Sequence, residues 1–90
     1  MKIDGLEVDE VIYYWYDHMV LRSNGDADRV KKAIQDHDFE TFMAFKKRYG
    51  KEYFPDTAAM IGEDGSFIGN IDITIEENFN KITRSEFECG

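Results

Sequence analysis

Few side chains in this 90-residue chain are suited to chemistry, and their spacing matches no familiar reactive site. The two histidines, His18 and His37, have no second histidine or cysteine at the i+3 or i+4 spacing that chelates a metal on a helix. Cys89 is the single cysteine, so it has no partner for an internal disulfide. Its place next to the last residue is also a poor one for holding a nucleophile rigidly. The sequence therefore predicts neither a zinc site nor a thiol nucleophile.

Three acidic clusters could support other chemistry. Asp36-His37-Asp38 could hold an oriented imidazole, but the favoured interpretation is a polar turn between helices in which one Asp is a cap. Asp26-Ala27-Asp28 and Glu63-Asp64-Gly65 lack the other ligands of a calcium loop. No Walker loop or dinucleotide fingerprint is present either. We therefore expect a protein that is not an enzyme, with no catalytic, cofactor-binding or metal-binding residues.

The elements that position these residues are predicted to be helices in the first half of the chain. In residues 8–22, apolar side chains share one arc of a helical wheel: Val8, Val11, Ile12, Trp15 and Met19. Asp26 is predicted to cap a second helix that runs to about Gln35, and Asp38 a third from Phe39 to Tyr49. From this third helix, Phe39, Phe42, Met43 and Phe45 are expected to meet Trp15 and Met19 in the core. Residues 1–7 could form a short strand through Ile3 or simply lead into the first helix.

The second half of the chain reads as a sheet, because six of the nine isoleucines fall in the last third and β-branched side chains suit a pleated surface. We predict strands at 57–61, 66–75 and 82–87, with a tight turn at Asp64-Gly65 and the last strand at an edge. The predicted fold class is α+β, with three N-terminal helices packed on a C-terminal three-stranded antiparallel sheet. It forms one domain over 1–90, with a helical half at 1–50 and a sheet half at 56–88.

Charge is the most distinctive property of the sequence. The 19 acidic and 11 basic residues give a net charge of −8, and the acids concentrate toward the two ends. Such a surface repels nucleic acid and anionic lipid and attracts basic proteins, although acidity also serves solubility alone. No apolar run approaches the length of about 18 residues that a membrane span requires. We therefore expect a cytoplasmic protein that binds neither nucleic acid nor membranes directly.

Two sets of residues are candidates for contacting a partner. Seven carboxylates could present charges at spacings that resemble phosphates: Glu63, Asp64, Asp72, Glu76, Glu77, Glu86 and Glu88. Tyr13 and Tyr14 could supply aromatic contacts, since tyrosine is enriched at interface hot spots. The alternative for the tyrosines is that they are buried between two layers of the fold.

In its size, its acidity and its lack of a catalytic motif, the chain resembles the small inhibitors that phages and mobile elements encode against host nucleases, the anti-CRISPR and antirestriction class. The resemblance rests on these gross properties and on no motif. It implies a non-catalytic inhibitor that acts in the bacterial host cytosol. Such a protein docks on a basic nucleic-acid-binding surface of a larger defence nuclease, for example by DNA or RNA mimicry. The alternative is a cellular protein-interaction module or regulatory subunit, which could be a homodimer paired through the edge strand 82–87.

Overall fold

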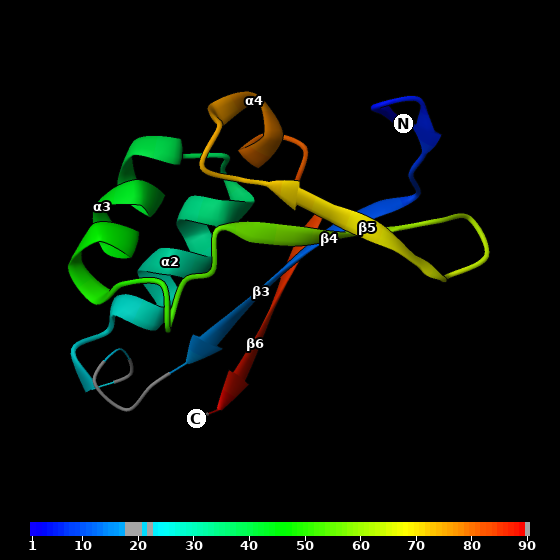
Figure 1. Ribbon diagram of the computed structural model, residues 1–90. Coiled ribbons are helices and arrows are strands. Elements are labelled where there is room, and N and C mark those ends of the chain that lie inside the picture. The colour runs from blue at the N-terminus through cyan, green and yellow to red at the C-terminus, as the bar shows by residue number, and fades with distance from the viewer. Residues whose placement is uncertain (18–20, 22, 90) are drawn as a thin grey trace.

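The computed structural model describes residues 1–17, 21 and 23–89, with only the backbone of residues 17, 88 and 89. A four-stranded sheet and a small N-terminal hairpin are the β-structure of this part of the chain (Figure 1). The elements follow in the order β1 (Lys2–Ile3), β2 (Leu6–Glu7), β3 (Glu10–Asp17), α2 (Asp26–Gln35), α3 (Phe39–Tyr49), β4 (Thr57–Ile61), β5 (Phe67–Asp72), α4 (Glu76–Phe79) and β6 (Arg84–Cys89). Strands thus come first and helices lie in the middle, so the predicted division into a helical half and a sheet half is wrong.

The main sheet has the strand order β5-β4-β3-β6. β5 and β4 are antiparallel, as are β4 and β3, whereas β3 and β6 run parallel with Ile12 opposite Arg84. The prediction of three N-terminal helices on a three-stranded antiparallel sheet is therefore wrong in helix number, strand number and strand direction. Of the two alternatives for residues 1–7, the strand through Ile3 is observed, because β1 pairs with β2.

The largest correction concerns residues 8–22, for which the sequence predicted one helix. Most of this segment is strand β3, and the end of the predicted helix lies largely outside the described residues. Its apolar side chains satisfy a period of two as well as a helical period, since Val11, Tyr13 and Trp15 are all buried on the same face. Aromatic and β-branched side chains also favour extended backbone. Pairing with strands on both sides therefore outweighed the helical pattern.

Helices α2 and α3 occur where the sequence predicted them. The prediction that Asp26 caps α2 is off by one residue, because Gly25 is the cap residue and its φ of 80° lies in the left-handed region that favours glycine. Asp38 caps α3 as predicted, and its Oδ1 accepts a hydrogen bond from Thr41 N at 3.2 Å. These local signals were sufficient because each acts within four residues of the helix start.

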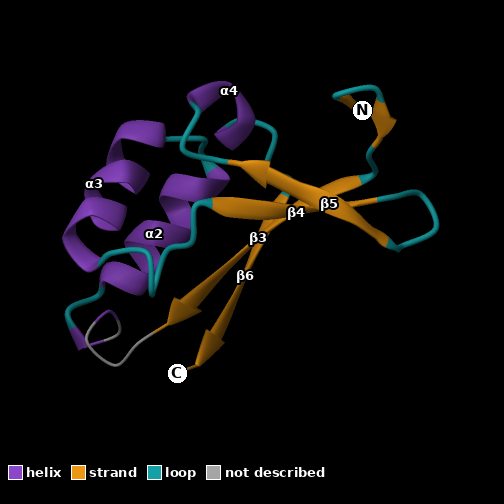
Figure 2. Cartoon of the chain, viewed as in Figure 1, coloured by secondary structure: helices purple, strands orange, loops and turns teal. Residues whose placement is uncertain are grey.

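The hairpin β4–β5 also follows the prediction. β4 has the predicted bounds, and in the turn Asp64 Oδ1 accepts a hydrogen bond from Ser66 N at 3.0 Å. β5 ends at Asp72 instead of continuing to Ile75, and the predicted turn after it contains the single-turn helix α4. β6 begins two residues later than predicted but does lie at an edge of the sheet. Figure 2 shows the tip of the hairpin projecting away from the helices.

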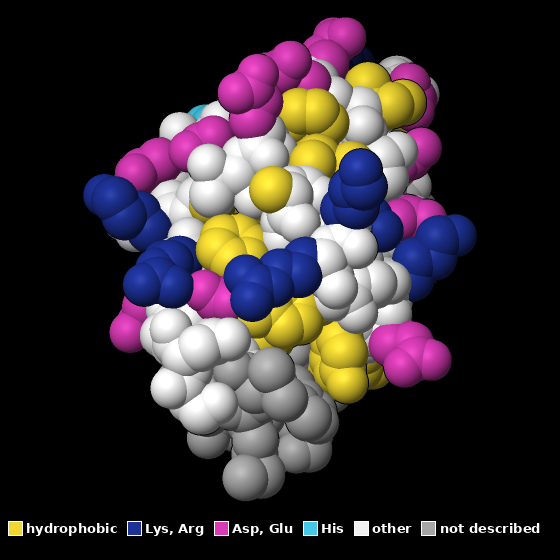
Figure 3. All heavy atoms as spheres, turned by 90° about the vertical axis from the view of Figure 1, so that its left-hand side faces the viewer, with side chains coloured by type: hydrophobic (Ala, Val, Ile, Leu, Met, Phe, Trp, Pro, Cys, Tyr) yellow, Lys and Arg dark blue, Asp and Glu magenta, His cyan; other side chains and the backbone are white. Residues whose placement is uncertain are grey.

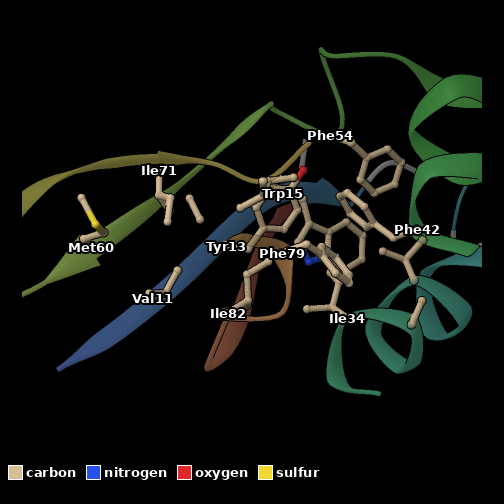
Figure 4. Close-up of a cluster of buried hydrophobic side chains, with 14 of the residues drawn as sticks. Val11, Tyr13, Trp15, Ile34, Phe42, Phe54, Met60, Ile71, Phe79 and Ile82 are labelled. Atoms are coloured by element: carbon tan, nitrogen blue, oxygen red, sulfur yellow. The ribbon is translucent and has the colours of Figure 1, made fainter. Parts of the chain in front are cut away.

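The core is an aromatic cluster between the sheet and the helices, shown in Figure 4. Trp15 stacks on Phe54 with ring centroids 5.6 Å apart, and Phe42 contacts Phe79 at 4.9 Å. Phe42 and Trp15 are therefore in the core, but they are joined through Phe54, with centroids of Phe42 and Phe54 6.0 Å apart. The other predicted core residues of α3 are only partly buried: Phe39, Met43 and Phe45. Met19 lies outside the described residues.

Candidate partner-binding surface

The helices pack against one face of the main sheet, and we call the other side the open face. Side chains alternate between the two faces of a strand. Along β3, Tyr13 and Trp15 point to the helices, where Tyr13 contacts Phe42 with ring centroids 5.3 Å apart. Tyr14 and Tyr16 therefore point to the open face, and both are exposed.

The strand register shows which side chains lie together on the open face. Ile12 lies opposite Arg84 of β6 and also opposite Ala59 of β4, which lies opposite Asn70 of β5. Two residues further along, Tyr14 of β3 lies opposite Glu86 of β6, and Thr57 of β4 lies opposite Asp72 of β5. All four of these side chains are exposed. An accessible tyrosine thus lies beside the carboxylate of Glu86 on the neighbouring strand.

The two tyrosines named from the sequence have different environments. Tyr14 is 45% exposed, whereas Tyr13 is fully buried and its hydroxyl donates a hydrogen bond to Pro55 O at 2.7 Å. Burial, and to a lesser extent the charge of Asp56, raises the pKa of Tyr13 above its usual range. Tyr13 therefore belongs to the core and does not reach the surface. Tyr16, which is 44% exposed, is a surface tyrosine that the sequence reasoning missed.

Five of the seven candidate carboxylates lie near the two ends of β5. Glu63 and Asp64 are in the β4–β5 turn, Asp72 ends β5, and Glu76 and Glu77 begin α4. All five are exposed, and among the described residues none of them forms an ion pair.

Hydrogen bonds favour the charged form of two of these carboxylates. The hydroxyl and the amide of Ser66 donate to Asp64 and lower its pKa, and the hydroxyl and the amide of Thr74 do the same for Asp72. The two ends of β5 therefore hold negative charge that nearby cations do not pair with.

The remaining two candidate carboxylates are on β6. Glu86 pairs with Arg84, whose Nη1 lies 2.5 Å from Glu86 Oε1, and Arg84 Nε also contacts Glu10 at 3.1 Å. The charge of Glu86 is thus partly neutralised within the fold. The side chain of Glu88 lies outside the described residues.

The helical side has a different charge pattern. Figure 3 shows a band of lysine and arginine side chains across this face, with acidic side chains along its upper margin. Two cations from the end of α3 are used within the fold, because Lys46 pairs with Asp56 and Arg48 Nη1 lies 3.7 Å from the buried Asp26. Hydrogen bonds from Lys46 and Lys51 lower the pKa of Asp56. These pairs tie loops and helix ends together.

The part of the chain that the structure describes does not bring candidate reactive residues together into a site. His37 has a positive φ of 55°, and its Nε2 lies 3.2 Å from Ile82 O, so the ring bridges the α2–α3 turn and the start of the last strand. The described residues contain no group of three or more potential metal ligands. His18 and the side chain of Cys89 lie outside this part of the chain.

No protein-family model, curated protein or solved structure matches this chain. In the described part of the chain, no helix combines the length and apolar character needed to cross a bilayer. Function must therefore be inferred from the surfaces themselves.

Proposed function

We propose that the chain is a non-catalytic binding protein that docks on a larger basic protein through its acidic carboxylates and its open face. The observation that carries this proposal is the set of five exposed carboxylates at the ends of β5, none of which is paired with a cation among the described residues. Exposed charges of one sign steer a partner of the opposite sign and give specificity.

The spacing of these charges suits an extended basic surface. β5 has six residues, and at about 3.3 Å per residue it separates the two acidic groups by roughly 20 Å. Successive phosphates of one DNA strand lie about 3.4 Å apart along the helix axis, so the two groups span about six phosphates. The partner we propose is a nucleic-acid enzyme, such as a host defence nuclease, whose binding channel would accept these carboxylates in place of phosphates.

Tyr14 on the open face offers a second kind of contact to the same partner. Its ring is accessible, and it lies beside Glu86 on the neighbouring strand. An arginine or lysine of the partner could stack on the tyrosine ring and pair with a carboxylate at the same time.

The test is to immobilise the full chain, capture proteins from a bacterial lysate and identify them by mass spectrometry. We expect a basic nucleic-acid enzyme to be captured and its activity to be inhibited by the free chain. A triple variant with Glu63→Gln, Glu76→Gln and Glu77→Gln should lose capture. The control variant, Glu40→Gln with Glu52→Gln, removes exposed acids elsewhere and should keep it.

Salt and a tyrosine variant separate the two kinds of contact. If contacts of the carboxylates supply most of the affinity, binding weakens steeply with added salt. If contacts of Tyr14 supply most of it, binding is salt-tolerant and is lost in Tyr14→Ala. Capture that survives both the triple variant and Tyr14→Ala would refute the proposal. So would turnover of a substrate by the purified chain.

A further inference from the structure

A groove lies between α2 and β6, on the opposite side of the sheet from the open face. It has a volume of about 490 Å³, which is within the range of sites that hold small ligands or short peptide segments. One wall is a face of α2 formed by Lys31, Ile34 and Gln35, which recur at helical spacing. The other wall is the chain from Ile82 to Phe87.

The strand wall of the groove is an edge of the sheet, since within the described part of the chain β6 is paired with β3 alone. Val11 turns its backbone toward β6, because its N–H donates to Thr83 Oγ1 and its carbonyl accepts from Thr83 N. Backbone groups alternate in direction along a strand, so Tyr13 and Trp15 also face β6. In a parallel ladder each of them bonds to the residues on either side of its register partner.

The register partners themselves, Ser85 and Phe87, therefore turn their N–H and C=O groups away from the sheet. Their side chains lie on the helix side, where Phe87 contacts Trp15 with ring centroids 5.4 Å apart. The edge of β6 thus presents the backbone N–H and C=O groups of Ser85 and Phe87, two residues apart, next to the apolar side chains of Ile34 and Phe87. This is the arrangement that pairs with an extended peptide strand.

The charges of the groove residues indicate which kind of peptide binds there. Among the described residues, the nine that line the groove include no acidic one, in a chain with 19 acidic residues. Lys31 Nζ lies 3.8 Å from the centre of the Phe87 ring, and no carboxylate pairs with it among the residues described. The guanidinium of Arg84 is instead held by Glu10 and Glu86. Lys31 is therefore placed to receive an acidic group from a bound chain.

We propose that this groove binds an extended peptide segment of a partner protein, which adds to β6 as a fifth strand and carries an acidic side chain that pairs with Lys31. Its other inward side chains are apolar and contact Ile34 and Phe87. A second copy of β6 fits less well, because pairing two such edges brings together two chains that each carry a net charge of −8. A free anion would use only Lys31 and leave the strand edge unpaired.

The test starts from a displayed library of random ten-residue peptides selected on the full-length protein. We expect selected peptides to alternate apolar residues with one conserved acidic position and to shift the amide NMR signals of Ser85 and Phe87. Lys31→Glu should weaken binding about tenfold or more, because it places a carboxylate opposite the acidic side chain of the peptide. Lys32→Glu, which changes a neighbouring exposed lysine outside the groove, is the matched control and should leave affinity unchanged.

Ser85→Pro gives a second, independent test. Proline removes the N–H that the register turns outward at the edge and that an added strand would use, so the variant should fold but bind selected peptides more weakly. Three results would overturn the proposal: peptides that leave the β6 signals unmoved, equal losses from Lys31→Glu and Lys32→Glu, or inorganic phosphate binding at Lys31 as tightly as the peptides. A stable dimer that excludes the peptides would also overturn it in favour of a second copy of the chain.

Discussion

Asp26 connects the start of α2 with the end of α3, and its replacement tests how much a buried carboxylate stabilises this fold. Its side chain is only 4% exposed and accepts hydrogen bonds from the Tyr49 hydroxyl at 2.5 Å and from Arg29 Nη1 at 2.7 Å. The hydrogen bond from Tyr49 lowers the pKa of Asp26 most, followed by the hydrogen bond from Arg29 and the positive charges of Arg48 and Arg29. The folded state therefore favours the charged form.

The replacement Asp26→Asn keeps the shape of the side chain but removes its charge. Because the two carboxylate oxygens accept from different donors, the amide group of asparagine must face one of those donors. Hydrogen bonds to charged groups contribute about 1.5–3 kcal/mol, so we expect a loss of that size in the free energy of unfolding. Tyr49→Phe should cost about 1–2 kcal/mol. The double variant should lose less than the sum, since both changes remove the same bond.

The assay is urea unfolding followed by the fluorescence of Trp15, the single tryptophan. A lowered pKa in the folded state gives stability that is present above the unfolded pKa of about 3.9 and is lost as the pH falls through the folded value. The difference between wild type and Asp26→Asn should thus be constant from about pH 5 to 7 and shrink below about pH 4. A variant within about 0.5 kcal/mol of wild type at pH 7, or a difference that persists in acid, would refute this reasoning.

Five further substitutions can be measured in the same unfolding assay. Phe42→Ala empties the centre of the aromatic core and should cost about 3–5 kcal/mol, whereas Phe67→Ala, at a position 60% exposed, should cost under about 0.5 kcal/mol. Lys46→Ala removes the largely buried partner of a carboxylate and should cost about 1–3 kcal/mol. Lys51→Ala removes the 78% exposed partner of the same carboxylate and should cost less than about 0.5 kcal/mol. Gly25→Ala meets no steric contact but must hold a φ of 80°, so a loss of about 1 kcal/mol is expected from backbone strain alone.

The elements that could be predicted from the sequence are those with local signals. The caps and periodicity of α2 and α3 act within a few residues, as does the turn at Asp64-Gly65. β3 could not be recognised in the same way, because a short aromatic run fits both a helical arc and a strand. Its strand state depends on parallel pairing with residues about 72 positions away, for which no local pattern exists.

The same limit applies to the binding surfaces. Exposed carboxylates such as Glu63 and Glu76 could be named directly, because charged side chains are rarely buried. Which of Tyr13 and Tyr14 is exposed follows only once residues 10–17 are known to form a strand, because neighbouring side chains of a strand face opposite sides. The same knowledge would have shown that Tyr16 is exposed. The groove beside Lys31 could not be predicted from the sequence, because it forms between α2 and β6, which are far apart in the chain.

The parallel pairing of β6 with β3 also affects how the protein is made. β3 precedes its parallel partner β6 by about 72 positions, so β3 is synthesised well before the strand that pairs with its second edge. Until β6 pairs with it, the hydrogen-bonding edge of β3 beside Tyr13 and Trp15 is uncovered and open to other nascent chains. A chain truncated before residue 84 should therefore leave this edge exposed and aggregate.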